Sequence, residues 1–463
     1  MLRLMDTRTR RVEEIVPTTA GVLRMYACGP TVYKFGHLGN LRSYLLADLV
    51  RRVAERHHLR VELVQNITDV GHLQDDTTDT GEDKVLTAAR AEGRSASELA
   101  RFYEAAFHRD LAALNIRPAA AYPRASDCIE LMQEMIGRLI EAGHAYAAAG
   151  SVFFDARSFP SYGALSGNRL DELRPGHRTP VGEVAPGKRF HADWGLWKAA
   201  GANRAMVWKS PWGLGFPGWH IECSAMSLRY LGESIDVHTG GIDLRFPHHE
   251  DERAQSDSSV GHEVVRHWVH GEHLLADGRK MAKSTGNVVL LTDVVERGLD
   301  PLAVRLFFLS GRYRQQLNLT WDALTAADRT LARWRARVAE WAEFPSKPMC
   351  AGYVPEVYDA FDNDLDTPAA LQVLRRIERD EEIPAGSKFE MFAHLDALFS
   401  LDVVRDVGRR SDPLPADAAQ LLAARAAARA AHDWAAADRL REELSALGVR
   451  VTDTPAGQTY AVR

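Results

Sequence analysis

The chain has 463 residues, of which 46% are hydrophobic and 26% are charged, and its formal net charge is −6 at pH 7. This composition is typical of a folded globular protein, and it excludes both a disordered chain and a uniformly basic coat for nucleic acid. Any RNA would have to be bound by local basic patches. No segment approaches the roughly 20 apolar residues needed to cross a membrane. The four cysteines have no repeated close spacing and no signal-like segment opens the chain, which predicts a cytoplasmic protein.

The first part of the chain is predicted to form a parallel α/β unit. The apolar segment Val22–Ala27 is typical of a strand, and a turn rich in glycine and proline follows it. An amphipathic helix is expected next, because apolar residues recur near helical spacing at Leu41, Leu45, Leu49 and Val53. A second strand, Val61–Val64, ends in Asn66-Ile67-Thr68-Asp69. In such a unit, ligands bind at the carboxyl ends of the strands.

From about residue 95 the pattern becomes helical, which predicts an insertion between two halves of the sheet. One apolar face is kept by Ile129, Met132, Ile136, Leu139 and Ile140. We expect Ser126 to cap this helix and Gly143 to end it. The segment 174–188 is rich in proline and glycine and predicts a long loop.

The second half of the sheet is expected after Trp208. A strand is predicted at Ile235–His238, and a strand-like run extends from Trp268 to Leu275. Between them, Pro247 stands near the first position of a helix, where its missing N–H costs little. A further helix is expected to begin at Asp300-Pro301.

The last part of the chain is predicted to be helical, with a β hairpin at its end. Residues 321–401 form a helical bundle, and an Ala/Arg-rich helix follows. Trp434–Leu447 forms another helix, which Gly448 ends. Val449–Thr452 should then pair with Thr459–Val462.

Four residues of metal-ligand type lie beside segments suited to a nucleotide: Cys28, Cys223, His248 and Glu252. Thiolates select zinc over magnesium or calcium. His248 and Glu252 share one helical face, but position 253 is Arg, which argues against the HExxH motif of metalloproteases. The alternative is that the cysteines are small core residues.

Two segments suit phosphate groups. His37-Leu38-Gly39-Asn40 follows a strand and begins a helix, where backbone N–H groups and the helix dipole favour anions. Gly39 allows close approach of the backbone, while His37 and Asn40 can donate hydrogen bonds. In the second half, Lys280 and Lys283 lie in a Gly-flanked segment and suit the charge that develops on ATP. Taken singly, a structural histidine in a βα turn and a solvated lysine loop are the alternatives.

In combination, these segments resemble the signatures of class I aminoacyl-tRNA synthetases: His37–Asn40 the HIGH motif and Lys280–Ser284 the KMSKS motif. Over essentially its whole length the chain resembles the cysteinyl-tRNA synthetase family, through further segments at Tyr26–Tyr33, Gly218–Ser224, Phe246–Glu252 and Asp433–Asp438. Asn40 replaces the last histidine of HIGH but keeps a hydrogen-bond donor. Ala282 replaces the middle serine of KMSKS, and both lysines remain.

The resemblance implies cysteine, ATP and the cysteine tRNA as substrates, with no DNA or membrane partner and a monomer favoured over a dimer. One zinc per chain would be held by Cys28, Cys223, His248 and Glu252, and would bind the substrate sulfur as thiolate. A site that needs one specific ligand atom can reject an analogue such as serine by roughly 10⁴ to 10⁵ without editing.

The resemblance also assigns the residues of the two-step reaction. ATP would lie against His37, Gly39, Asn40, Asp243, Lys280 and Lys283, of which His37, Asn40, Lys280 and Lys283 are catalytic. Mg²⁺ would accompany its phosphates. Thr68 and Trp219 would line the cysteine pocket, with core packing the alternative for Trp219.

Transfer to tRNA would use basic and aromatic residues of the last third. Arg329, Arg333 and Arg337 recur every four residues and could meet phosphates; a solvated helix face is the alternative. Trp434, Asp438 and Arg439 could stack on and bind unpaired anticodon bases.

The predicted fold is α/β: a Rossmann-like parallel-sheet catalytic domain with an insertion, a helical bundle and a small mixed C-terminal module. The expected divisions are residues 1–95 and 206–315 for the two catalytic halves, 96–205 for the connective insertion, 316–405 for the tRNA-binding bundle and 406–463 for the anticodon module. The rival functions are a cysteine ligase of thiol biosynthesis and an inactive RNA-binding relative. A zinc hydrolase would lack a general base beside the ligands.

Overall fold

The computed structural model describes residues 1–70, 73–75, 80–173, 187–201, 204, 206–281, 286–409, 417–454 and 457–462. The chain divides into two compact units, Met1–Val404 and Arg405–Arg463. Each unit is described by itself.

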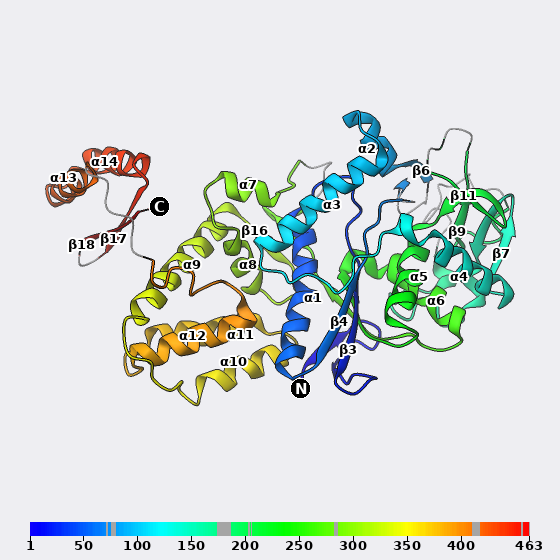
Figure 1. Cartoon of the computed structure of the whole chain (residues 1–463), viewed down its shortest axis with the longest axis horizontal. Coiled ribbons are helices and arrows are strands. Elements are labelled where there is room, and N and C mark those ends of the chain that lie inside the picture. The colour runs from blue at the N-terminus through cyan, green and yellow to red at the C-terminus, as the bar shows by residue number, and fades with distance from the viewer. Residues whose placement is uncertain are drawn as a thin grey trace. The chain divides into compact units, whose positions relative to one another are not determined.

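A four-stranded parallel sheet lies at the centre of the first unit (Figure 1). Its order is β13-β12-β3-β4, with β3 at Val22–Ala27, β4 at Arg60–Gln65, β12 at Ile235–Gly241 and β13 at Val265–Gly271. All seven residues of β12 are buried, as expected for a strand covered on both faces. The pairing of Val237 with Met25 joins the two halves of the sheet, which confirms the predicted parallel arrangement.

The strand-like run from Trp268 to Leu275 is divided between two sheets, contrary to the single strand expected. β13 ends at Gly271, and β14 (Leu274–Ala276) pairs with β15 (Arg279–Lys280) and β16 (Leu317–Leu319). The guanidinium of Arg42 donates to the carbonyls of Glu272 and His273 at 2.9 and 3.0 Å. Those two carbonyls are therefore occupied by a side chain at the point where the chain changes sheet.

Helices cover both faces of the parallel sheet (Figure 1). α1 (Leu38–Arg56) lies on one face and buries a run of leucines, because its apolar residues recur at helical spacing. α5 (Trp219–Leu231) and α6 (His248–Val260) pack together on the other face. Pro247 is the N-cap of α6 and precedes the helix by one residue.

The insertion combines helices with a five-stranded antiparallel sheet. The sheet has the order β10-β11-β9-β8-β7 and reaches beyond residue 205 to Pro217. Its strands are β7 (Ala145–Ala148), β8 (Ser151–Phe154), β9 (Trp194–Ala199), β10 (Trp208–Ser210) and β11 (Gly213–Pro217). The helices of the insertion are α3 (Ala96–Ala113) and α4 (Ile129–Glu141), and α2 (Lys84–Glu92) precedes it.

The start of α4 differs from the prediction. Ser126 does not cap it, because this residue lies in a 3₁₀ turn, Ala125–Cys128, and its hydroxyl donates to Asp69 at 2.6 Å. Gly143 follows the helix with φ of +80°, a conformation that glycine adopts without strain, so the predicted end is confirmed.

Short elements complete the catalytic part. Two hairpins are formed, by β1 (Arg3–Asp6) with β2 (Arg11–Glu14) and by β5 (Leu73–Asp75) with β6 (Thr80–Asp83). Three further 3₁₀ turns lie at Ala156–Ser158, Leu170–Glu172 and Ile242–Arg245.

The predicted helical region after the sheet is confirmed. It consists of α7 (Leu291–Glu296), α8 (Pro301–Leu309), α9 (Trp321–Trp341), α10 (Tyr353–Asp362), α11 (Thr367–Arg379) and α12 (Ala385–Phe399). Asp300 caps α8 by accepting from the N–H of Leu302, with Pro301 at the first helical position. Trp334 and Phe392 are buried and meet edge to face in this core.

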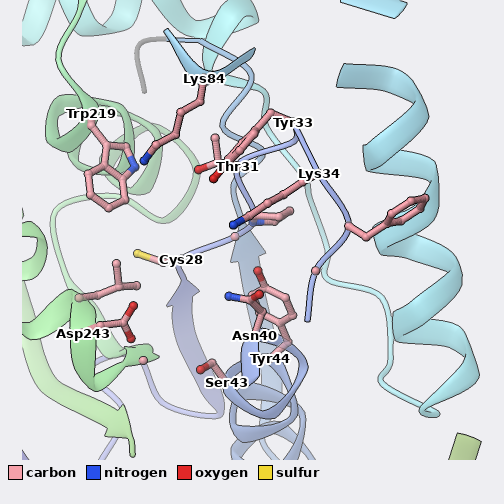
Figure 2. Close-up of a pocket in the computed structure, with 16 residues that line it drawn as sticks. Cys28, Thr31, Tyr33, Lys34, Asn40, Ser43, Tyr44, Lys84, Trp219 and Asp243 are labelled. Atoms are coloured by element: carbon pink, nitrogen blue, oxygen red, sulfur yellow. The ribbon is translucent and has the colours of Figure 1, made fainter. Parts of the chain in front are cut away.

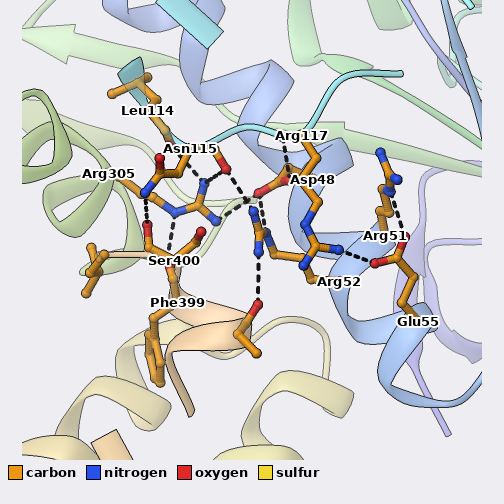
Figure 3. Close-up of polar contacts among 12 residues, drawn as sticks. Asp48, Arg51, Arg52, Glu55, Leu114, Asn115, Arg117, Arg305, Phe399 and Ser400 are labelled. Carbon is orange, nitrogen blue, oxygen red and sulfur yellow. Dashed lines mark hydrogen bonds and ion pairs between the residues drawn. The ribbon is translucent and has the colours of Figure 1, made fainter. Parts of the chain in front are cut away.

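A buried arginine joins these helices to the rest of the first unit (Figure 3). Arg305 of α8 has no exposed surface. It donates to the carboxylate of Asp48 on α1, and to the main-chain carbonyls of Leu114, Asn115 and Phe399. The helix whose N-terminus is the HIGH-like motif is therefore bound directly to the bundle.

The second unit is a small α/β module with α13 (Ala418–Ala430), α14 (Trp434–Ala446), β17 (Val449–Thr454) and β18 (Gly457–Val462). The predicted hairpin is confirmed in its register, since Val449 pairs with Val462 and Thr452 with Thr459. Across the described residues of both units, no helix combines the length and apolarity that a bilayer span requires.

Candidate active site and metal centre

The HIGH-like motif forms a reciprocal cap at the N-terminus of α1. His37 is the N-cap, and its Nδ1 accepts from the backbone N–H of Asn40 at 3.2 Å. The Oδ1 of Asn40 accepts in return from the N–H of His37 at 3.0 Å. Because the carbonyl end of the Asn40 amide is used in this way, its NH₂ end is the donor available to a ligand. A Cβ at Gly39 would come within 3.0 Å of the His37 ring, so glycine leaves room for that ring.

His37 is a neutral donor at pH 7. Burial and the nearby charge of Lys34 lower its pKa to about 4. In a neutral imidazole only one nitrogen carries a proton. Since Nδ1 accepts a hydrogen bond, that proton lies on Nε2, which can donate to an anionic oxygen.

A cavity of about 260 Å³ opens beside this cap (Figure 2). Its wall includes Cys28, Asn40, Trp219 and Asp243, which the sequence analysis selected. Thr68 is absent from the described residues that line it, and Thr31 of the neighbouring segment is present instead. The Thr68 hydroxyl lies deeper, donating to Glu222 at 2.9 Å.

The wall also contains two lysines, Lys34 and Lys84, that the sequence motifs do not predict. Lys34 lies 5.2 Å from the centroid of the Tyr33 ring. Lys84 is the first residue of α2, and its side chain extends into the cavity beside Trp219 (Figure 2). A lone lysine after an acidic loop has no motif that would have identified it.

The four metal-ligand residues come together next to the cavity. One ligand atom from each of Cys28, Cys223, His248 and Glu252 lies within 4.8 Å of all the others, and all four side chains are buried. Cys28 follows β3, Cys223 lies on α5, and the other two share one face of α6 at the predicted spacing. His248 Nε2 is 2.9 Å from Glu252 Oε1. Cys28 also lines the cavity, so the cluster borders it.

The electrostatics of this cluster favour a bound cation. Burial raises the pKa of the Cys28 thiol, and the neighbouring Cys223 and Glu252 raise it further. Burial opposes the charged form of His248, but Glu252 and Cys223 outweigh it and raise its pKa to about 10. Thiolates and a carboxylate held together away from water would be compensated by a metal ion that prefers soft ligands. The cluster can therefore hold a metal ion.

Hydrogen bonds from neighbouring side chains orient His248. Its Nδ1 lies 2.8 Å from Nδ1 of His220, whose Nε2 is 3.4 Å from Asp251. The hydroxyl of Tyr162 donates to the same carboxylate at 2.6 Å. A chain of this kind, ending in a carboxylate, fixes the ring of a metal-binding histidine.

A second group of donors was not anticipated from the sequence. His238 and His249 approach Cys28 Sγ at 3.6 and 3.2 Å and could share an ion with it and Glu252. Burial is the first cause of a lowered pKa at both rings, so they are neutral. The signal available was the pair His248-His249 together with a histidine in the middle of the buried strand β12.

The KMSKS-like segment adjoins the same helix terminus. The N–H of Leu38 donates to the carbonyl of Val289 at 3.0 Å, and Lys280 is near enough for its charge to lower the pKa of His37. The negative charge of Asp243 raises the pKa of the same ring, but the lowering effects are larger. Ala282 and Lys283 lie outside the described residues.

The expected tRNA-binding side chains have different environments. On α9, Arg333 pairs with Glu378 at 2.8 Å and Arg337 with Glu340 at 2.9 Å, so these two arginines already contact carboxylates. Arg329 lies on the same helix.

In the second unit, Trp434 is 53% exposed, which leaves its ring accessible for stacking. The guanidinium of Arg429 is 5.4 Å from its centroid. Asp438 and Arg439 are exposed on the same helix, α14.

Comparisons with known proteins identify the family of the chain. Residues 14–329 match the family model of the tRNA synthetases class I (C) catalytic domain, and residues 411–460 match the cysteinyl-tRNA ligase anticodon binding domain. A cysteine–tRNA ligase of Thermus thermophilus is 43% identical, over 99% of both chains. Cysteine–tRNA ligase 1 of Burkholderia lata is also 43% identical, over 99% of this chain and 96% of the relative.

Solved structures support the fold. A Mycobacterium tuberculosis methionyl-tRNA synthetase in complex with methionyl-adenylate has a TM-score of 0.57 and 17% identity, covering 88% of this chain and 94% of that one. An Agrobacterium radiobacter LeuRS–tRNA–LeuAMS complex has a TM-score of 0.60 and 13% identity, covering 85% of each. From the sequence matches over nearly its whole length, the chain belongs to the cysteinyl-tRNA synthetase family of the class I aminoacyl-tRNA synthetases.

Proposed function

We propose that this protein activates cysteine with ATP and transfers it to the cysteine tRNA. The observation that supports this most directly is the buried cluster of two sulfurs, a nitrogen and a carboxylate at the wall of the cavity. In that cavity the sulfur of a thiol-bearing substrate would lie at the cluster, and the phosphates of ATP would lie toward the α1 terminus.

The ion proposed for the cluster is zinc, held by Cys28, Cys223, His248 and Glu252. When bound, zinc would supply a Lewis acid that keeps the substrate sulfur as thiolate, which a serine hydroxyl cannot match. The protein also orients the metal-binding ring, because His220 contacts His248 and is in turn held by Asp251.

In the first step, an oxygen of the cysteine carboxylate forms a bond to the α-phosphorus of ATP. The bond from that phosphorus to the bridging oxygen breaks, and cysteinyl-adenylate and pyrophosphate result. The protein orients the two anions and stabilises the charge that develops on the phosphates. We assign this task to the Nε2–H of His37, the amide NH₂ of Asn40, and the ammonium groups of Lys280 and Lys283.

The remaining ligand contacts follow from placement in the cavity. Asp243 suits a ribose hydroxyl or the substrate ammonium, and Trp219 packs beside the substrate side chain. The ring centroids of Trp219 and His248 are 4.2 Å apart, which supports a role for Trp219 beside the proposed sulfur site. Mg²⁺ would accompany ATP through its phosphates.

In the second step, a terminal ribose hydroxyl of the tRNA attacks the carbonyl of the adenylate, AMP leaves, and an ester forms. We propose that Trp434, Asp438 and Arg439 contact the anticodon. The exposed indole supports this proposal, since stacking of an unpaired base requires an open ring face. Among the α9 arginines, Arg333 and Arg337 would have to exchange carboxylates for phosphates.

Two activities of the purified protein test the proposal. Cysteine-dependent exchange of pyrophosphate into ATP measures the first step, and charging of a tRNA with the cysteine anticodon measures the second. We expect both. Exchange without charging would instead indicate a cysteine ligase that acts on a small acceptor. The absence of both activities would refute the proposal.

A further inference from the structure

We propose that Lys84 binds the α-carboxylate of the cysteine substrate, an inference that rests on the proposed function. Lys84 and Cys28 line the same cavity. In Figure 2 the Lys84 ammonium ends beside the indole of Trp219, across from the side chain of Thr31. It therefore lies at the amino-acid end of the cavity, near the cluster proposed to hold the sulfur.

The cavity separates its positive charges along its length. Lys34 acts on the ring of His37, because its charge lowers the pKa of that residue, so it belongs to the phosphate end. Lys84 lies beside Trp219 (Figure 2). In cysteine the carboxylate is only two carbons from the sulfur. With the cysteine sulfur at the cluster, the carboxylate is therefore within reach of the Lys84 ammonium group.

The backbone on both sides of Lys84 is held in place. Asp83 caps α2 by accepting from the N–H groups of Val85 and Leu86 at 2.8 and 3.3 Å. Its carboxylate also pairs with Arg204, whose guanidinium lies 3.4 Å from the centroid of the Phe216 ring.

Val85, the residue after Lys84, is also held in place, because it has no exposed surface and packs with Leu99 and Tyr33. The lysine between these two anchors presents its side chain to the cavity from a fixed position. Such preorganisation reduces the entropy lost when a ligand binds.

A cation at this position has a chemical use. The attacking carboxylate and the α-phosphate are both anions, and they repel each other as the new bond forms. An ammonium group on the carboxylate lowers that repulsion while the two groups are brought together. It also distinguishes cysteine from thiols that lack a carboxylate.

Binding of cysteine and of cysteamine to the zinc-loaded protein tests the inference. Cysteamine keeps the thiol and the amine but lacks the carboxylate. A charge-assisted contact contributes a factor of about 10 to 100 in affinity. We therefore expect titration calorimetry to show that Lys84→Met lowers the affinity for cysteine by that factor and leaves the affinity for cysteamine unchanged. Lys84→Arg should retain most of the preference for cysteine.

Lys209→Met is the matched control, because Lys209 is an exposed lysine on β10 that does not line this cavity. It should bind both ligands as the unaltered protein does. Equal weakening of cysteine and cysteamine by Lys84→Met, or no weakening of either, would overturn the inference. Pyrophosphate exchange by the unaltered protein is measured in parallel, so a failure of the proposed function is detected separately from the binding result.

Discussion

The carboxylate of Asp48 offers a test of how α1 is held in the first unit (Figure 3). Its Oδ2 accepts from Nε of Arg52 at 2.7 Å and from Nη2 of Arg305 at 2.8 Å. Its Oδ1 accepts from the backbone N–H of Arg117 at 3.1 Å. The Asp48 and Arg305 side chains have 0% exposure and that of Arg52 has 5%. Asp48→Ala would leave two buried guanidinium groups and one N–H without this acceptor.

The expected cost follows from burial. Removing one partner of a buried ion pair destabilises a protein by about 3 to 5 kcal/mol. We expect Asp48→Ala to lower the free energy of unfolding of the first unit by that amount. Glu55→Gln is the control on the same helix, because Glu55 accepts from Arg51 at 2.8 Å and also pairs with Arg117, and these three side chains are 21–42% exposed. Each such exposed pair contributes about 1 kcal/mol or less.

Urea unfolding followed by tryptophan fluorescence measures both changes from the shift in midpoint at a common slope. Burial raises the pKa of Asp48, but the charges of Arg305 and Arg52 outweigh it, and the net pKa lies below the usual value. The stabilisation is therefore present above about pH 4, the pKa of an unfolded aspartate. It is lost as the pH falls through the lower folded value, so the gap between the two proteins should shrink in acid. Equal losses for Asp48→Ala and Glu55→Gln, or a gap independent of pH, would refute the reasoning.

Three further predictions concern the site and the tRNA. Cys223→Ser should lower both the zinc content and the cysteine-dependent pyrophosphate exchange. Cys350→Ser changes a half-buried cysteine outside the cluster and should alter neither. Mass spectrometry of the intact protein measures the zinc content of each variant. Since the pKa of His37 is about 4, its NMR ring signals should stay unchanged from pH 8 to about 5.5. The unfolded chain takes up that proton first, so His37 should reduce stability as the pH falls from about 6.5, and a titration midpoint near 6.5 in the folded protein would contradict this. Trp434→Ala should raise the KM for tRNA by a factor of about 5 to 150, from the ~1–3 kcal/mol of one stacked base, and leave pyrophosphate exchange intact. Tyr230→Ala, which removes an exposed aromatic of the first unit, should leave both unchanged.

Local patterns in the sequence were sufficient for most elements and for the signature residues. Hydrophobic periodicity predicted α1 and α4, and turn residues predicted the register of the β17–β18 hairpin, because these features depend on neighbours within one or two turns of chain. The metal-ligand types could be selected because thiol, imidazole and carboxylate are chemically unusual in combination. The HIGH-like and KMSKS-like motifs are contiguous and needed no structure.

Other features depended on contacts that no local pattern contains. Ser126 does not cap α4, because its hydroxyl donates to Asp69. The strand expected to continue to Leu275 ends earlier, and the chain enters another sheet where Arg42 donates to two main-chain carbonyls. Arg333 of the expected basic stripe meets Glu378 on another helix. In each case a contact with a residue distant in the sequence overrides the local preference, because burial and pairing contribute more to the free energy of folding than intrinsic propensity does.

By itself, the sequence determined which residue types and which helices and strands this protein has, and through them its family. Only the tertiary structure decided which of those residues meet. It brought His249 to Cys28, Lys84 to the wall beside Trp219, and Arg305 to Asp48. The physical reason is that periodicity and capping act over a few residues, whereas a site at the carboxyl ends of parallel strands is assembled from segments that meet only when the sheet forms.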